Sequence, residues 1–495
     1  MIVSAMSDND TSPMTGTAEP SAGEGKPELN RAIGPGLLLL FIVGDILGTG
    51  VYALTGKVAK EVGGAVWLPF LCAFIVAMLT AFSYLELVTK YPRAGGAAVY
   101  AHKAFGVHFL TFLVCFTVMC SGLTSASSAA QAFAGNLNKA AHFGWESGGT
   151  MLLLAALGFM ALVAIINLRG VGESVKVNVV LTIVELSGLL IIIAIGVWAI
   201  MQGKGDAATL TQFNVKEGSN LFTAVASATA LAFFAMVGFE DSVNMAEETK
   251  DPVKTFPKMM LIGLSITGVI YVLVAIASVT LVKPAELGEG ETPLLKVVQA
   301  GAPAFPIAIF AVITMFAVAN SALINMLMAS RLLYGMAHEG VLPVTLGRIL
   351  PKRRTPWVAI LFTTVLAFGL VWFADLKALG GTTSFLLLIV FTITNIAVLV
   401  LRRDKVEHRH FKAPTVIPVI GAVLCGFLAS PLSKRDPKDY QVAAVLLVVG
   451  VVLWLLHWLS TRFIGTGRTN KPEHIEELGI HHDELNRQRE GRPWT

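Results

Sequence analysis

The amino-acid sequence predicts an all-α polytopic membrane protein with twelve transmembrane helices. Hydrophobic residues make up 55% of its 495 residues and charged residues only 14%, whereas a soluble domain carries roughly 25% charged residues. The apolar residues gather in runs of about 20, the length that an α-helix needs to cross a bilayer. This composition excludes a soluble globular enzyme, a disordered protein and a nucleic-acid-binding domain, and it predicts the lipid bilayer as the surroundings.

Twelve apolar runs define the predicted spans in chain order. They cover residues 33–54, 65–88, 105–134, 150–167, 176–201, 221–245, 257–282, 304–330, 356–374, 381–401, 414–431 and 440–463. A transmembrane β-barrel is excluded, because its strands would alternate apolar and polar residues over about ten positions. The polar segment 1–32 is typical of a disordered tail and lacks the apolar core and cleavage site of a signal peptide. Segment 464–495 is a second polar tail.

The distribution of positive charge predicts the orientation. An even number of spans places both tails on the same side of the membrane. Most of the 37 Lys and Arg residues fall on the tails and on the loops that share their side. Since cytoplasmic loops carry an excess of Lys and Arg, we expect a multi-pass protein of the cell membrane with both termini in the cytoplasm.

Two of the spans are interrupted by glycine. The first carries the segment 44–50, Gly-Asp-Ile-Leu-Gly-Thr-Gly, and the sixth carries the segment 234–241, Phe-Ala-Met-Val-Gly-Phe-Glu-Asp. Glycine inside a helix costs roughly 1 kcal/mol relative to alanine, and unwound backbone within a bilayer is tolerated only where it lines a cavity or packs in protein. The alternative is that the glycines only allow close helix packing.

The positions of these breaks predict an internal repeat. They fall in the first span of each half if residues 33–201 and 221–401 form two inverted repeats of five helices. Paired interrupted helices in corresponding positions indicate the binding site of a secondary transporter. We therefore expect a ten-helix core over residues 33–401, followed by two further helices within 402–463.

The chemistry of two such breaks suits an α-amino acid. A half-helix that begins near Thr49 and Gly50 offers free N–H groups and the positive end of a helix dipole, which favour a carboxylate. Freed carbonyl groups near Ile46 and around 235–238 suit an ammonium group. An α-amino acid carries both groups on one carbon.

Carboxylates inside the spans are the other candidate functional residues. A charged group at the bilayer centre costs about 2.5–3.5 kcal/mol, so such residues are functional candidates: Asp45, Glu86, Glu185, Glu240 and Asp241. Each has a structural alternative. Asp45 would bond the amides of its own broken helix, Glu86 would pair with a loop cation, and Asp241 would pack between helices while Glu240 faces the pocket. No basic residue lies in the turns next to Glu185.

Other chemistry finds no support in the sequence. The histidines lack the spacing of a metal site, and the HExxH, Walker A and GxSxG patterns do not occur. The four cysteines lie in or beside apolar runs, where small packing residues are expected. We therefore predict neither an enzyme nor a bound metal or cofactor.

Four segments resemble motifs of the amino acid–polyamine–organocation (APC) superfamily. They are GDILGTGVYALTG at 44–56, SYLELVTKYPRAGGAAVYAHKAFG at 83–106, FFAMVGFEDSVNMAEETKDPVKTFPK at 233–258 and SRLLYGMAHEGVLP at 330–343. The sequences of these motifs are most similar to those of the cationic-amino-acid-transporter-like branch. The resemblance implies the LeuT-type fold, a 5+5 inverted repeat with helices 1 and 6 broken, here with two more helices.

The resemblance also implies roles for residues in the breaks. The Thr49 and Gly50 amides, beside Gly48, would hold the substrate carboxylate. The carbonyls of Ile46, Ala235 and Val237, beside Gly238, would hold its amino group. Phe234 would be an aromatic lid, and Glu240 matches an acidic residue linked to pH-dependent gating. Glu185 stands where some proton-coupled relatives have a lysine, so here a carboxylate would carry the proton or support a cation site.

These observations together predict a secondary active transporter that imports an amino acid by alternating access, with H+ as the coupling ion and Glu185, Glu240 or Asp45 in the coupling or gating. The alternative is an exchanger of amino acids or polyamines. A nutrient receptor would be favoured by a large soluble tail, and the tails here are short. The side-chain class of the substrate and the oligomeric state stay open.

Overall fold

The computed structural model describes residues 33–92, 96–146, 148–169, 175–214, 220–246, 249–338, 341–350 and 355–463. Ten helices of this described part are long and apolar enough to cross a membrane, and two shorter apolar helices accompany them. The two predicted tails, 1–32 and 464–495, lie outside the described residues. The protein is therefore an all-helical membrane protein.

The helices follow one another with short connections. In the first half they are α1 (Pro35–Ile46), α2 (Thr49–Val62), α3 (Trp67–Lys90), α4 (Gly96–Phe105), α5 (His108–Ala140), α6 (Thr150–Arg169), α7 (Val175–Met201) and the 3₁₀ turn η1 (Ala207–Thr211). In the second half they are α8 (Leu221–Ala232), η2 (Phe233–Met236), η3 (Asp241–Met245), α9 (Pro252–Leu281), α10 (Pro284–Leu287), α11 (Pro293–Gly301), α12 (Ile307–His338), η4 (Val344–Gly347), α13 (Trp357–Phe373) and α14 (Leu376–Leu401). The chain ends with α15 (Val416–Ala429), η5 (Pro431–Ser433) and α16 (Pro437–Phe463).

Local sequence signals explain where several helices begin. Proline occupies one of the first two positions of α1, α9 and α11, where its missing N–H costs no helical hydrogen bond. Asp375 caps α14, since its side chain accepts a hydrogen bond of 2.9 Å from the Ala378 amide. Asn220 and Thr223 form a reciprocal capping box at the start of α8.

Several helices extend beyond the apolar runs that predicted them. The run 105–134 corresponds to α5, which begins at His108 and ends at Ala140. The run 304–330 corresponds to α12, which begins at Ile307 and ends at His338. An apolar run ends where the side chains become polar, whereas the helical hydrogen bonds of the backbone continue beyond that point. The helices α4 and α11 lie between predicted spans and were not predicted, because ten residues or fewer give no membrane-length apolar signal.

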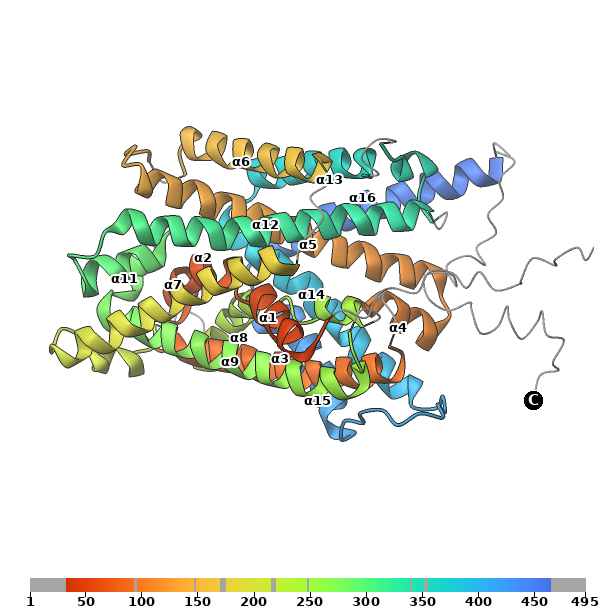
Figure 1. Cartoon of the computed structure of the whole chain (residues 1–495), viewed down its shortest axis with the longest axis horizontal. Helices are drawn as coiled ribbons and strands as arrows, with labels where there is room; N and C mark the ends of the chain where they lie inside the picture. Colours follow the sequence, from red (N-terminus) through yellow and green to blue (C-terminus); the bar gives the residue numbers. More distant parts are fainter. Residues whose placement is uncertain are drawn as a thin grey trace, which may run out of the picture.

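Helices of the first half pack against helices at corresponding positions in the second half. Helix α5 packs on α12, α3 on α9, and α6 on α13. The contacts of the broken helices also correspond: α1 packs on α9 and α7, while α8 packs on α3 and α14. Figure 1 shows the long helices running along one axis, with α11 at one end of the molecule and α4 at the other.

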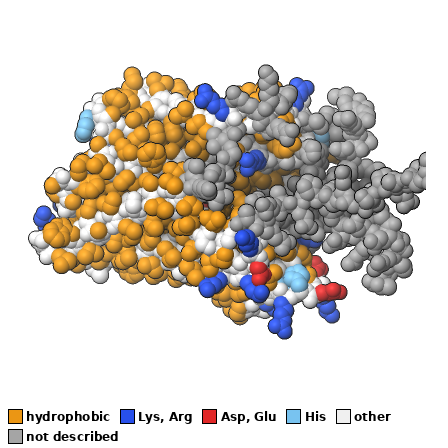
Figure 2. Space-filling model, viewed as in Figure 1, with side chains coloured by type: hydrophobic (Ala, Val, Ile, Leu, Met, Phe, Trp, Pro, Cys, Tyr) orange, Lys and Arg blue, Asp and Glu red, His pale blue; other side chains and the backbone are white. Residues whose placement is uncertain are grey.

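The outer surface is apolar over most of its length. Large hydrophobic side chains are exposed on several helices, for example Trp198 at 59% and Val365 at 60%. Figure 2 shows apolar side chains covering most of one face, with most of the charged side chains on that face toward the end that holds α4. Because a soluble monomer rarely exposes apolar patches larger than a few hundred Å², this surface suits lipid.

Candidate functional site

The first predicted span is two helices separated by a break. Helix α1 ends at Ile46, and α2 begins at Thr49. Gly48, at φ −57° and ψ −146°, turns the chain between them. The first N–H groups of α2 have no partner within their own helix, and Thr49 and Gly50 at this start are both buried. The geometry therefore directs a helix N-terminus into the interior of the bundle.

The sixth predicted span is interrupted in a different way. Helix α8 ends at Ala232 and passes through one 3₁₀ turn to Val237, which is extended. Gly238 follows at φ +124°, a backbone conformation that a residue with a side chain rarely adopts. The chain then continues as the 3₁₀ helix η3 rather than as an α-helix.

The two breaks lie against each other, backbone to backbone. A Cβ atom on Gly50 would be 2.4 Å from the Ala235 Cα, and a Cβ on Gly238 would be 2.7 Å from the carbonyl carbon and oxygen of Asp45. Such distances are far below van der Waals contact, so both positions need glycine for this approach. The structure thus brings together segments separated by more than 180 positions in the sequence.

Some polar groups of the breaks are already hydrogen-bonded, whereas the Thr49 hydroxyl is not bonded to any described residue. The Tyr271 hydroxyl of α9 donates to the Ile46 carbonyl at 2.6 Å, which leaves that oxygen one further lone pair. The Thr49 Oγ1 atom is buried and has no hydrogen-bond partner among the described residues. Phe234 is buried next to the breaks, with one ring atom 3.5 Å from where a Cβ on Gly380 would lie.

Glu240 caps the second break. Its Oε2 atom accepts a hydrogen bond of 2.9 Å from the Gly238 amide. Glu240 and Asp241 both line a small cavity of about 20 Å³ that also includes Val237 of the break and Ser121 of α5. The carboxylate is therefore joined directly to the irregular backbone, and any change in its charge would act on the geometry of that backbone.

Glu185 lies where three helices meet. Its carboxylate is fully buried on α7, and its Oε1 atom accepts a hydrogen bond of 3.2 Å from the Asn320 amide of α12. Its Oε2 atom has no hydrogen-bond partner among the described residues. The Tyr52 hydroxyl of α2 donates to the Glu185 backbone carbonyl. Asp45 lies at the other side of the first break, on the last turn of α1.

Glu86 has the loop cation that the sequence predicts. Arg402, at the end of α14, donates to Glu86 from Nε at 2.8 Å and from a terminal nitrogen at 2.7 Å. The Ala413 amide donates to the same carboxylate at 2.9 Å. This bidentate pair joins α3 to the segment after α14, and its role is structural.

Sequence reasoning missed two tyrosines of this region. Tyr52 and Tyr271 are fully buried and bond backbone carbonyls of other helices. A single tyrosine in an apolar run gives no sequence signal for such a contact. Asn320 was recognisable only as one of several polar residues in its span.

A bundle of membrane-spanning helices that brings two interrupted helices together in its interior defines a membrane transport protein. The chain belongs to the amino acid permease family, which matches residues 37–458. It is a transporter and not an enzyme. Membership of this family implies the LeuT-type arrangement of helices.

Several named transporters are similar to this chain over most of its length. The branched-chain amino acid permease BcaP of Bacillus subtilis (strain 168) is 26% identical, over 88% of this chain and 95% of the relative. The methylthioribose transporter of the same organism is 28% identical over the same shares. The vacuolar cationic amino acid transporter 4 of Arabidopsis thaliana is 28% identical over 77% of this chain and 64% of the relative.

Proposed function

We propose that this protein imports an amino acid across the cell membrane by alternating access, with the two breaks as its binding site. The observation that carries the proposal is the backbone contact between the breaks at Gly50 and Ala235, beside the buried Thr49 hydroxyl, which bonds none of the described residues. Irregular backbone at this depth is expected only where it packs in protein or lines a cavity. A substrate held between the breaks would contact both halves of the bundle and could change how they are arranged relative to each other.

The proposed architecture is twelve spans with two inverted repeats at 33–201 and 221–401. The exchange of packing partners, α1 with α9 and α8 with α3, supports a pseudo-twofold relation between the halves. Helix α15 has 14 residues, about 21 Å at 1.5 Å per residue, and we propose that its flanking residues complete the crossing of a hydrocarbon core of about 30 Å. Both termini are proposed to lie in the cytoplasm.

The proposed substrate is bound by its head group. The Thr49 and Gly50 amides and the Thr49 hydroxyl hold the carboxylate, while carbonyls of Ile46, Ala235 and Val237 hold the ammonium group. Gly48 and Gly238 give the backbone its irregular path, and Phe234 covers the site. The names of the relatives include branched-chain and cationic amino acids, so the side-chain class is an outcome of the test.

The proposed coupling ion is the proton, carried by Glu185 or Glu240, with Asp45 in gating. Burial disfavours the charged form of a carboxylate. The Glu240 carboxylate accepts a hydrogen bond from the Gly238 amide of one break. The Glu185 carboxylate accepts a hydrogen bond from Asn320, and the Glu185 backbone carbonyl accepts one from the Tyr52 hydroxyl. A proton on either residue would therefore change contacts next to the site. The alternative function is exchange of amino acids or polyamines without a proton gradient.

The test is uptake into proteoliposomes with and without an inward proton gradient. The panel contains L-leucine, L-arginine, L-glutamate and methylthioribose, and putrescine tests the polyamine alternative. We expect one amino acid to accumulate only with the gradient, and Glu185→Gln or Glu240→Gln to abolish that dependence. The matched control is Glu146→Gln, which removes an exposed carboxylate outside the breaks. Flux that requires internal substrate and ignores the gradient would establish exchange instead, and accumulation of methylthioribose alone would reject an amino acid substrate.

A further inference from the structure

A cavity of about 680 Å³ opens at the far end of α2, away from the breaks. We call it the outer cavity. Its walls come from α2, α5, α6, the α10–α11 connection and the junction of α13 with α14. Figure 1 places this region at the end of the molecule that holds α11. Its volume lies within the range of about 300–1,000 Å³ that is usual for small-molecule sites.

The outer cavity is a separate place from the breaks. Lys57 and Lys60 line it, and they follow Thr49 on the same helix by 8 and 11 residues. At 1.5 Å per residue these lysines lie roughly 12 and 16 Å along the axis from Thr49. A ligand of amino acid size held at Lys60 therefore does not reach the amides at the start of α2.

On the α14 side each charged side chain has an ion-pair partner, and three carboxylates face two lysines. The Lys377 Nζ atom lies 2.7 Å from a Glu61 oxygen and 3.1 Å from an Asp436 oxygen, and Lys438 lies 3.1 Å from Asp375. Burial alone would raise the pKa of Asp375. The Ala378 amide and Lys438 outweigh it and hold that pKa below its usual value, so Asp375 is ionised at neutral pH and its charge is matched.

On the α2 side two lysines face one carboxylate. The Lys57 Nζ atom donates to the Gly288 carbonyl at 2.9 Å. Lys60, one turn further along the same face of α2, forms no hydrogen bond or ion pair with the described residues. Glu291 lies on the facing wall, and its charge acts on Lys57. Lys60 is therefore a lysine of the cavity wall that pairs with no carboxylate of the described residues, while the lining as a whole holds three lysines and three carboxylates.

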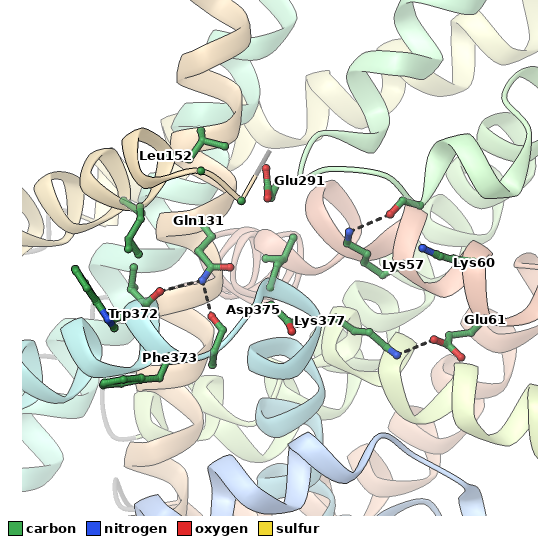
Figure 3. Close-up of a pocket in the computed structure, with 18 residues that line it drawn as sticks. Lys57, Lys60, Glu61, Gln131, Leu152, Glu291, Trp372, Phe373, Asp375 and Lys377 are labelled. Carbon is green, nitrogen blue, oxygen red and sulfur yellow. Dashed lines mark hydrogen bonds and ion pairs between the residues drawn. The ribbon is translucent and has the colours of Figure 1, made fainter. Parts of the chain in front are cut away.

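The wall that carries Glu291 is fixed by close packing. A Cβ on Gly135 of α5 would be 3.1 Å from the Glu291 Cβ and 3.3 Å from its Oε2 atom, so the glycine lets the Glu291 side chain lie along α5. Figure 3 shows Glu291 between Gln131 on one side and Lys57 on the other. The two signs of charge thus face the same space from different elements.

We propose that the outer cavity is a second binding site for an α-amino acid, with Lys60 holding the carboxylate and Glu291 the ammonium group. The inference rests on the proposed amino acid transport and gives the substrate a loading position before it reaches the breaks. A cation and an anion on facing walls select a zwitterion. An amine without a carboxylate would leave Lys60 without a partner and bind less well.

The test measures thermal unfolding of the purified full-length protein with L-leucine, L-arginine and L-glutamate. These amino acids share the same α-amino and α-carboxyl groups and differ in the class of their side chains. Isoamylamine, the amine without the carboxylate, is the head-group control. A ligand that binds the native state raises its melting temperature. Thr49→Val weakens the site at the breaks, and Lys60→Gln is then added to it. Lys434→Gln is the matched control, an exposed lysine that does not line the outer cavity.

We expect at least one amino acid, but not isoamylamine, to stabilise the Thr49→Val protein. Adding Lys60→Gln should raise the half-saturating concentration about tenfold, whereas Lys60→Arg and Lys434→Gln leave it unchanged. No stabilisation of Thr49→Val by any of the three amino acids, or stabilisation that Lys60→Gln does not weaken, overturns the outer site even where proteoliposomes show uptake. Stabilisation that depends on Lys60 in a protein without uptake would reject the transport proposal and leave the outer site standing.

Discussion

At the scale of single residues, the Thr49 hydroxyl is a polar group that a bound substrate would satisfy. Its hydroxyl is buried at the start of α2 without a hydrogen-bond partner among the described residues, and a buried unsatisfied polar group costs about 1–3 kcal/mol. Substrate would supply the partner. The unsatisfied hydroxyl therefore destabilises the protein without substrate, and its hydrogen bond to the substrate stabilises the complex.

We predict that Thr49→Val raises the substrate KM roughly tenfold or more, because a hydrogen bond to a charged group is lost, while the melting temperature of the empty protein stays the same or rises. The control is Thr55→Val on the same helix, where the only hydrogen bond of the hydroxyl within the described part of the chain goes to the Val51 carbonyl, one turn earlier, at 2.6 Å. Uptake kinetics measure the KM of both variants, and thermal unfolding measures their melting temperatures. An unchanged KM in Thr49→Val contradicts a role in substrate binding.

Gly50 is the residue on which the approach of the two breaks depends. In Gly50→Ala the new Cβ would lie 2.4 Å from the Ala235 Cα, and backbone cannot yield as a flexible side chain can. We predict that transport falls at least tenfold, with a loss of stability of about 1–3 kcal/mol, as for overpacked cores. Gly158→Ala is the control, because nothing lies within 4 Å of that position. Wild-type uptake in Gly50→Ala would show that the breaks need not touch.

At the scale of elements, the charged anchor between α3 and α14 fixes how the second half joins the first. Glu86 is 2% exposed and receives two hydrogen bonds from Arg402 and one from the Ala413 amide. Removing one partner of a fully buried pair costs about 3–5 kcal/mol. The cost of removing Glu86 should be smaller, because the Arg402 side chain is 16% exposed.

We predict that Glu86→Gln lowers the stability of the protein by about 1–3 kcal/mol, measured by thermal unfolding in detergent. The double variant Glu86→Gln with Arg402→Gln should lose less than the sum of the single variants, because neither charge is then left alone. Strictly additive losses would mean that the two side chains do not act as a pair.

The elements also show what hydropathy predicts well and what it predicts poorly. The apolar runs at 65–88 and 150–167 nearly coincide with α3 and α6, because both helices lie within the bilayer over most of their length. The ends of α5 and α12 extend further, and α4 and α11 were not predicted. Those parts carry polar side chains or are short, so their helical state depends on neighbours distant in the sequence.

At the scale of the whole molecule, the unequal placement of charge predicts an orientation. Lys405 lies in the loop after α14 and Lys434 in the loop after α15, and both side chains are exposed. The proposed topology puts the first in the cytoplasm and the second outside. The two ends of the bundle should therefore differ in their access to reagents that cannot cross a membrane.

We predict that an impermeant maleimide labels Lys434→Cys in intact cells, and labels Lys405→Cys only after the cells are permeabilised. Both variants are made with Cys72→Ala, because Cys72 is partly exposed while the other three cysteines are buried. Labelling of Lys405→Cys in intact cells and of Lys434→Cys only after permeabilisation would reverse the proposed orientation.

The sequence by itself determined the membrane class, the apolar runs, the two breaks and the carboxylates within the spans. These follow from local physical causes, namely the length of an apolar run and the helix-weakening effect of glycine. Only the tertiary structure decided that Gly50 meets Ala235, that Tyr271 bonds the end of α1, and that Lys60 and Glu291 line one cavity. Such contacts join helices distant in the sequence, and hydropathy does not record which face of a buried helix meets which neighbour.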